Sequence, residues 1–153
     1  MSSIEGMDDV LGMLDGLEDE LLLAAMKGLE KGLKRTVAEA KALCQVDTGG
    51  LRNSIQSHVS RQGDKIDGTV SATGEHAVYV EMGTGPVGEV NHAGISPNAK
   101  PTYSPKGWTY FHPKQKQFFY SRGQPARPYM YPAYKLTKRQ IIEDVKAAIN
   151  KRG

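Results

Sequence analysis

The chain has 153 residues, with 20 Lys and Arg against 17 Asp and Glu and a formal net charge of +3. This length suits one domain, and so small a net charge does not require a nucleic-acid partner. The single cysteine, Cys44, excludes an intramolecular disulfide and fits a reducing compartment. No apolar run approaches the roughly 20 residues that span a bilayer. The sequence therefore favours a protein made in a cytoplasm, with no membrane partner.

Charge is distributed unevenly along the chain. The first twenty residues hold seven acidic side chains and no Lys or Arg, whereas bases dominate from Lys100 onward. Ends of opposite sign suit head-to-tail contacts between subunits, although solvated faces explain the pattern equally well. We expect residues 1–14 to be flexible or ordered only by a neighbour, and residues 15–153 to form one α+β domain.

A long helix is predicted over residues 16–45. Asp15 can cap its first turn and Glu18 follows three residues later, as in a capping box. Gly28 and Gly32 are unfavourable inside a helix, and their spacing of four indicates a place where another backbone approaches closely. One apolar stripe follows steps of three and four residues and consists of Leu22, Met26, Leu29, Leu33, Val37, Ala40 and Cys44.

The segment VDTGGLRNSI, residues 46–55, follows this helix. A phosphate-binding loop needs a strand before its glycines and a helix after them, and here the order is reversed. We therefore interpret the segment as an elbow. Asp47 and Thr48 would hydrogen-bond local amides, and Gly49 or Gly50 would adopt the left-handed conformation that ends the helix.

Three strands are expected after the elbow. Residues 54–61 and 65–73 alternate apolar and polar side chains around a turn, which predicts an antiparallel hairpin with one wet face. Residues 76–82, HAVYVEM, are rich in β-branched and aromatic types and are predicted to form the third strand. With helices packed on one face, these strands predict an α+β fold with a small antiparallel sheet.

The second half of the chain is expected to carry an extended arm and a final helix. Residues 86–125 are rich in Gly, Pro and Asn, and so long a loop is more often functional than not. Within it, residues 108–112 and 116–121 predict a projecting β-hairpin. A helix with Pro132 in its first turn should follow, and its apolar stripe is Ile141, Val145, Ala148 and Ile149.

The sequence offers little for catalysis. The four histidines are far apart and none has a ligand partner at helical spacing, which disfavours a metal site. No serine lies in a Gly-x-Ser-x-Gly elbow. We expect no enzyme activity, no metal and no cofactor. Glu81 is the notable carboxylate: it should either meet a cation, with Arg127 and Arg52 as candidates, or face water on an edge strand.

Residues 106–122 interleave bases with aromatic rings. That pattern suits nucleic-acid stacking, but rings on a projecting hairpin also suit buried protein contacts. Six or more exposed rings should be covered, and we favour a protein partner, with a nucleic-acid-binding module as the alternative. The side chains concerned are Lys106, Trp108, Tyr110, Phe111, Lys114, Lys116, Phe118, Phe119, Tyr120 and Arg122.

Three blocks together carry a family resemblance: VDTGGLRNSI (46–55), HAVYVEMGTG (76–85) and GQPARPYMYPA (123–133). In this order they resemble the tail-completion or head–tail joining proteins of long-tailed, non-contractile phages and prophages, typified by the tenth gene product of a lambdoid siphophage. The resemblance runs from about Leu29 to the C-terminus and leaves out the acidic N-terminal segment.

The resemblance implies a structural virion protein that forms a ring, most often a hexamer, at the neck between head and tail, after assembly in the cytoplasm of the host bacterium. Its partners would be copies of itself, head-completion or connector proteins and the tail tube protein, while DNA passes through without specific binding. The motif positions are implied to be fold and subunit-contact residues and fall on Asp47, Thr48, Gly49, Leu51, Arg52, Tyr79, Val80, Glu81, Gly83, Thr84, Gln124, Ala126, Arg127, Pro128 and Pro132.

Overall fold

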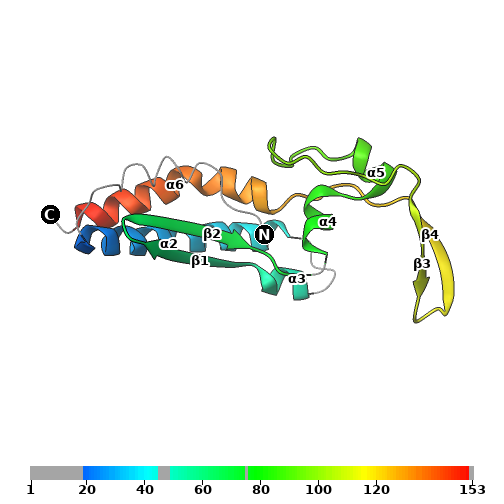
Figure 1. Cartoon of the computed structure of the whole chain (residues 1–153), viewed down its shortest axis with the longest axis horizontal. Coiled ribbons are helices and arrows are strands. Elements are labelled where there is room, and N and C mark those ends of the chain that lie inside the picture. Colours follow the sequence, from blue (N-terminus) through cyan, green and yellow to red (C-terminus); the bar gives the residue numbers. More distant parts are fainter. Residues whose placement is uncertain (1–18, 45–48, 75, 152–153) are drawn as a thin grey trace. The chain divides into compact units, whose positions relative to one another are not determined.

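The computed structural model describes residues 19–44, 49–74 and 76–151 (Figure 1). The chain divides into two compact units, residues 1–74 with 129–153 and residues 75–128. The expected single domain stays a prediction, because the division by compactness does not show whether the units unfold together. The first unit contains α2 (Asp19–Leu43), α3 (Gly49–Ser54), β1 (Gln56–Gln62), β2 (Lys65–Ser71) and α6 (Met130–Asn150). The second contains α4 (Ala77–Met82), α5 (Gly85–Val90), β3 (Trp108–His112) and β4 (Gln117–Ser121).

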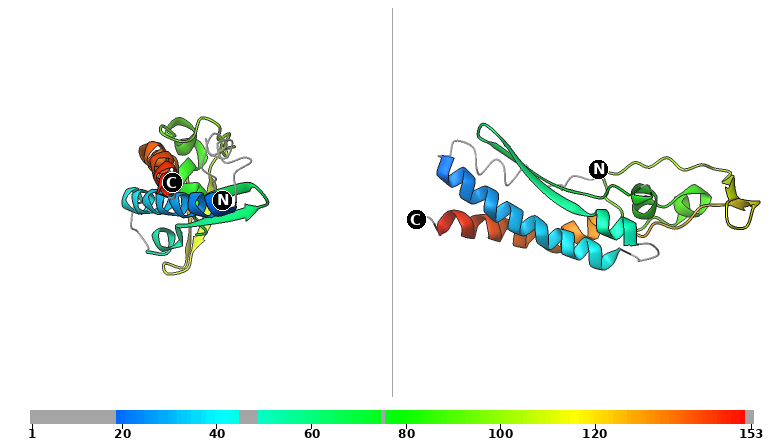
Figure 2. Two further views of the ribbon diagram at one scale, coloured as in Figure 1. Left: turned by 90° about the vertical axis from the view of Figure 1, so that its left-hand side faces the viewer. Right: turned by 90° about the horizontal axis from the view of Figure 1, so that it is seen from below.

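Helices α2 and α6 lie side by side along their length (Figure 1 and the right-hand view of Figure 2). The predicted close approach at the two glycines of α2 is confirmed. A Cβ atom on Gly28 would lie 2.6 Å from the carbonyl oxygen of Asp144 and 2.8 Å from the Cα atom of Val145. On Gly32 it would lie 2.9 Å from the Cα atom of Ile141. Only glycine therefore lets the two helix backbones come this close.

Two polar pairs cross the same helix interface. The hydroxyls of Thr36 and Thr137 lie 2.6 Å apart, and the Thr137 hydroxyl also lies 2.9 Å from the carbonyl oxygen of Ala133. Nε of Arg35 donates to the carboxylate of buried Asp144 at 2.9 Å. Both pairs satisfy groups that would be costly to bury alone, so they fix the register of α2 against α6.

The β1–β2 hairpin packs against the side of α2 that carries Leu33. Its strands are antiparallel, with Gln56 opposite Ser71 and Gln62 opposite Lys65. Ile66 and Val70 face the core, whereas Asp67 is exposed, as the alternation predicts. At Gly68 an added Cβ atom would lie 2.8 Å from a methyl carbon of Leu33, so the sheet also approaches the helix closely. This confirms the predicted first hairpin with its wet face.

The α+β class is confirmed, with both long helices and with two separate two-stranded antiparallel sheets, β1–β2 and β3–β4. The predicted third strand is wrong, because residues 77–82 form helix α4. Buried Ala77 and Glu81 stand four residues apart, which is helical spacing. Gly83 ends this helix with a φ of 78°. Tertiary burial thus outweighs the strand preference of this valine- and tyrosine-rich segment.

The elbow also differs from its prediction. Asp47 and Thr48 lie outside the described residues. Gly49 begins the short helix α3 and Gly50 continues it, and Gly50 does not adopt the left-handed conformation expected of one of the pair. Inside the long helix, the predicted stripe holds at most positions. Met26 and Val37 are only half-buried because the buried face turns toward the glycines.

The close helix contact gives a stability prediction. Gly28→Ala should lower the free energy of unfolding by about 1–3 kcal/mol, because overpacking at a backbone contact outweighs the gain in helix propensity. Gly50→Ala is the matched control: it is also in a helix, and an added Cβ atom there meets nothing within 4 Å. It should leave stability unchanged or raise it by up to about 1 kcal/mol. Urea unfolding measures both, and a Gly28→Ala protein as stable as the wild type would refute the contact.

Candidate subunit-contact site

The second unit is organised by a backbone clamp between two of the blocks noted in the sequence. Thr84 and Gln124 form an antiparallel bridge, in which the amide of Thr84 donates to the Gln124 carbonyl at 2.9 Å and the amide of Gln124 donates back at 3.1 Å. The Val87 amide donates to the carbonyl of Arg122 at 3.1 Å, and the Arg127 amide donates to the carbonyl of Val80 at 2.8 Å. Residues some forty positions apart in sequence are thus held together.

Glycines make the clamp possible. Gly83, Gly85 and Gly123 all have positive φ, at 78°, 62° and 94°. An added Cβ atom on Gly85 would lie 2.5 Å from the carbonyl oxygen of Arg122, and one on Gly123 would overlap the carbonyl oxygen of Thr84. The glycines of GTG and GQ are therefore needed for close backbone approach as well as for conformation. This requirement explains why glycines stand in the second block (76–85) and the third block (123–133).

The β3–β4 hairpin extends from this clamp, as predicted (Figure 1). Its register pairs Tyr110 with Phe119 and Phe111 with Phe118. The first pair stacks with ring centroids 6.0 Å apart, and the second meets edge to face at 5.3 Å. Because side chains alternate between the faces of a strand, each face of the hairpin carries one of these ring pairs.

The rings remain largely in contact with solvent. Phe118 is 72% exposed and Tyr120 is 63% exposed, while Phe111 is 50% exposed. Phe119 is half-buried between its neighbours. A two-stranded hairpin is marginal by itself, and an apolar patch of this kind marks a contact surface. The arrangement can bind by burying aromatic area.

A pocket of about 480 Å³ lies beside the base of the hairpin within the same unit. Its rim includes Val78 and Tyr79 from the exposed side of α4, and Trp108 from the first residue of β3. Tyr103 and Met82 also line the pocket, and the Tyr103 hydroxyl donates to the carbonyl of Met82 at 2.7 Å. The pocket and the exposed rings together form the candidate site, which we call the ring surface.

The surroundings of Tyr103 disfavour ionisation of its phenol. Burial, followed by the nearby negative charge of Glu89, raises the pKa of the Tyr103 phenol above its usual value of 10.0. Its ring also stacks against His92, with centroids 5.6 Å apart. The phenol is protonated near pH 7, as any tyrosine with a pKa at or above about 10 is, so Tyr103 acts here as a hydrogen-bond donor that fixes the loop.

The other sequence-predicted residues fall in several places. Glu81 is only 4% exposed, so the water-facing alternative is wrong, and its neighbour in the motif, Tyr79, is half-exposed. Nε2 of Gln124 lies 3.4 Å from the carbonyl oxygen of Tyr79, which joins two motif blocks. Leu51 and Arg52 lie on α3 of the first unit. Among the remaining second-unit positions, Arg127 pairs with Val80 in the clamp, and Ala126 and Pro128 are its neighbours in sequence.

The hairpin is basic. Residues 105–122 contain Lys106, Lys114, Lys116 and Arg122 and no Asp or Glu. This charge keeps nucleic-acid binding open as the alternative. Among the described residues, no group of three or more His, Cys, Asp or Glu could hold a metal ion, and no described helix is long and apolar enough to cross a membrane.

Comparison with known proteins identifies the family. Residues 8–83 match a family model described as "Bacteriophage HK97-gp10, putative tail-component". Residues 8–83 belong to this family. It is a family of phage structural tail components rather than of enzymes. Searches of curated proteins and of solved structures found no significant match.

The match to the family model runs from the acidic N-terminal segment to the end of α4. It therefore begins earlier than the motif resemblance, which left that segment out, and it ends at Gly83, before the clamp partner at Gln124 and before the hairpin. The ring surface is consequently supported by its own geometry. Sequence reasoning missed Val78 and Tyr103 in this surface. The signal for Tyr103 was present, since a tyrosine stands between two prolines in PTYSP.

The clamp yields a test in this tail component. Gly123→Ala should break the Thr84–Gln124 bridge, because its Cβ atom has no room, and should raise amide exchange at Thr84, Val87 and Gln124 at least tenfold. The matched control is Gly63→Ala, which also has positive φ but meets nothing within 4 Å. The control should lose some overall stability and leave exchange at the clamp unchanged. Equal effects of the two variants on exchange at the clamp would show a general loss of stability instead of a broken local contact, and would contradict the prediction.

Proposed function

We propose that this tail-component family member is a ring subunit of the phage neck that joins the head to the tail as a tail-completion or terminator-type protein. The observation that carries the proposal is the ring surface: a glycine-clamped hairpin with exposed aromatic pairs on both faces. Such a surface fits contacts with neighbouring subunits, because association removes the rings from water. The protein would act in the virion after assembly in the host bacterial cytoplasm.

The proposed partners follow from this role. Copies of the chain, most often six, would close a ring through contacts between a hairpin on one subunit and a surface elsewhere on the next, which is a heterologous contact. Head-completion or connector proteins and the tail tube protein would lie above and below. DNA would pass through the ring without specific binding, which is compatible with a net charge of only +3.

A nucleic-acid-binding module is the second candidate, because the hairpin combines four bases with exposed rings. The two functions make different demands on the same hairpin. Protein contact depends mainly on apolar ring area, whereas nucleic-acid binding depends on phosphate contacts and weakens steeply with salt. Removal of rings and removal of charges therefore separate them.

Two double variants provide this test. Phe111→Ser with Phe118→Ser should abolish incorporation into particles in a complementation assay, since buried aromatic anchors contribute about 2 kcal/mol or more each. Lys114→Gln with Lys116→Gln should retain incorporation. The reverse result, together with salt-sensitive DNA binding lost in the lysine variant, would favour the nucleic-acid module. Unchanged amide exchange at the Thr84–Gln124 clamp is the control that the second unit remains folded in both variants.

A further inference from the structure

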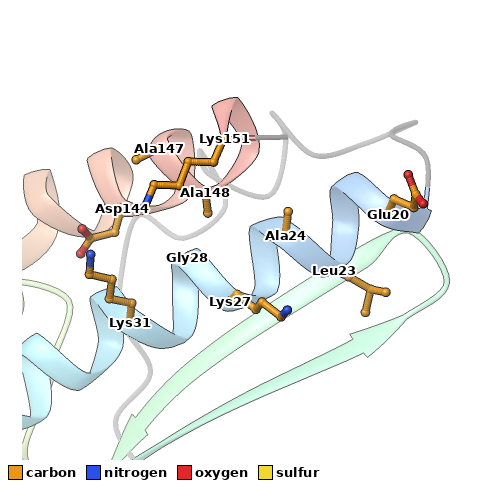
Figure 3. Close-up of a pocket in the computed structure, with 10 residues that line it drawn as sticks. All are labelled: Glu20, Leu23, Ala24, Lys27, Gly28, Lys31, Asp144, Ala147, Ala148 and Lys151. Carbon is orange, nitrogen blue, oxygen red and sulfur yellow. The ribbon is translucent and has the colours of Figure 1, made fainter. Parts of the chain in front are cut away.

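A second hollow lies in the first unit, between the start of α2 and the end of α6 (Figure 3). It has a volume of about 510 Å³ and runs along α2 from Glu20 to Lys31. Small side chains of α2 and α6, Ala24 and Ala148, face the seam between the helices. Leu23 adds exposed apolar surface at the rim, with 53% of the residue exposed. We call this hollow the lysine groove.

The groove is basic. Lys27, Lys31 and Lys151 line it, and none of the three forms an ion pair with another described residue. Of its two carboxylates, that of Asp144 is already bonded to Nε of Arg35 at 2.9 Å. Glu20 is the other carboxylate. Positive charge therefore exceeds negative charge along the groove, and it surrounds an apolar floor. An acidic segment with one apolar face is the ligand that such a surface fits.

The chain itself contains a segment of this chemistry. Residues 1–18 precede α2 and hold five acidic side chains and no base. They join α2 at Asp19, next to groove residue Glu20, so a short connection brings them to the groove. Their apolar residues recur at steps of three and four, as on one face of a helix, at Ile4, Met7, Leu11 and Leu14.

The lengths also agree. At about 1.5 Å per residue, residues 4–14 in a helical conformation would extend about 15 Å, and the groove extends about 16 Å along α2 from Glu20 to Lys31. The Asp15–Gly16 dipeptide between segment and helix is a turn signal, which a reversal of the chain requires. A segment tethered this close has a high effective concentration at the groove.

From these observations we propose that residues 4–14 fold back into the lysine groove of their own chain, with Met7, Leu11 and Leu14 toward the alanines and Leu23. Asp8 and Asp9 would lie close to the lysines. The contact is separate from the ring surface, which lies in the other unit. It would cover apolar surface at one end of the α2–α6 pair and explain why the acidic segment sits directly before α2.

Engineered cysteines test the position of the segment. With Cys44→Ser as background, Leu11→Cys and Ala24→Cys should form an intramolecular disulfide under dilute, mildly oxidising conditions. Peptide mapping of the full-length protein detects this link. A disulfide found only between molecules would assign the groove to a second copy, and no disulfide would place the segment elsewhere. Either result overturns the proposal.

Charge reversal tests the chemistry. Lys27→Glu, Lys31→Glu and Lys151→Glu together should raise amide exchange in residues 4–14 at least tenfold. The matched control reverses three exposed lysines outside the groove, Lys34, Lys65 and Lys146. It should leave that exchange unchanged. Equal exchange in both variants, or random-coil exchange in the wild type, would overturn the proposal. Groove protection that appears only with an added DNA oligonucleotide would assign the lysines to phosphate and overturn it as well.

Discussion

The backbone contact between α2 and α6 is the constraint on which the rest of the first unit depends. At Gly28 and Gly32 the helices touch without intervening side chains. Because the backbones meet, Thr36 reaches Thr137, and Arg35 reaches a buried Asp144 on the facing helix. A larger side chain at either glycine would separate the helices and leave these polar groups without partners, at a cost that adds to the steric one. The close packing of the helices and the hydrogen bonds of their buried polar groups therefore depend on each other.

The second unit is stabilised by a different principle. Its described residues, 76–128, form no long helix and no broad sheet, and its hairpin is joined to α4 and α5 by a few backbone hydrogen bonds at Thr84 and Gln124. Glycines make this close approach possible, while the rings of β3 and β4 stay in solvent. Stability is thus concentrated at the base of the hairpin, and apolar area is left at its far end. That distribution is unfavourable for an isolated monomer and favourable for a part that is completed by a neighbour.

The sequence predicts most of the fold because its strongest patterns are local. The stripe of α2 and the alternation in β1 and β2 each follow a regular period, and the second hairpin is marked by two short aromatic runs on either side of a polar turn. The strand prediction for residues 76–82 is wrong because so short a segment contains too few periods to separate a helix from a strand. Its Val and Tyr residues favour a strand, while burial of Ala77 and Glu81 on one face favours the helix that forms. The clamp could not be foreseen, since pairing of Thr84 with Gln124 leaves no periodic signal. Its glycines indicated where the backbone needs a positive φ, but they did not indicate which segment would pack against them.

The ring surface and the lysine groove differ in the forces they use, and this difference bears on assembly. Burial of the exposed rings lowers the free energy of association, and added salt strengthens this hydrophobic contribution or leaves it unchanged. Lysine–carboxylate contacts at an exposed groove are screened by salt over about 10 Å at 0.1 M. With both proposed contacts, one chain would carry a salt-tolerant contact in its second unit and a salt-sensitive one in its first. Raising the ionic strength should open the groove first, so the two contacts can be studied separately in the same intact protein. A tail component with both would combine a durable subunit contact with a terminal segment that is easily released.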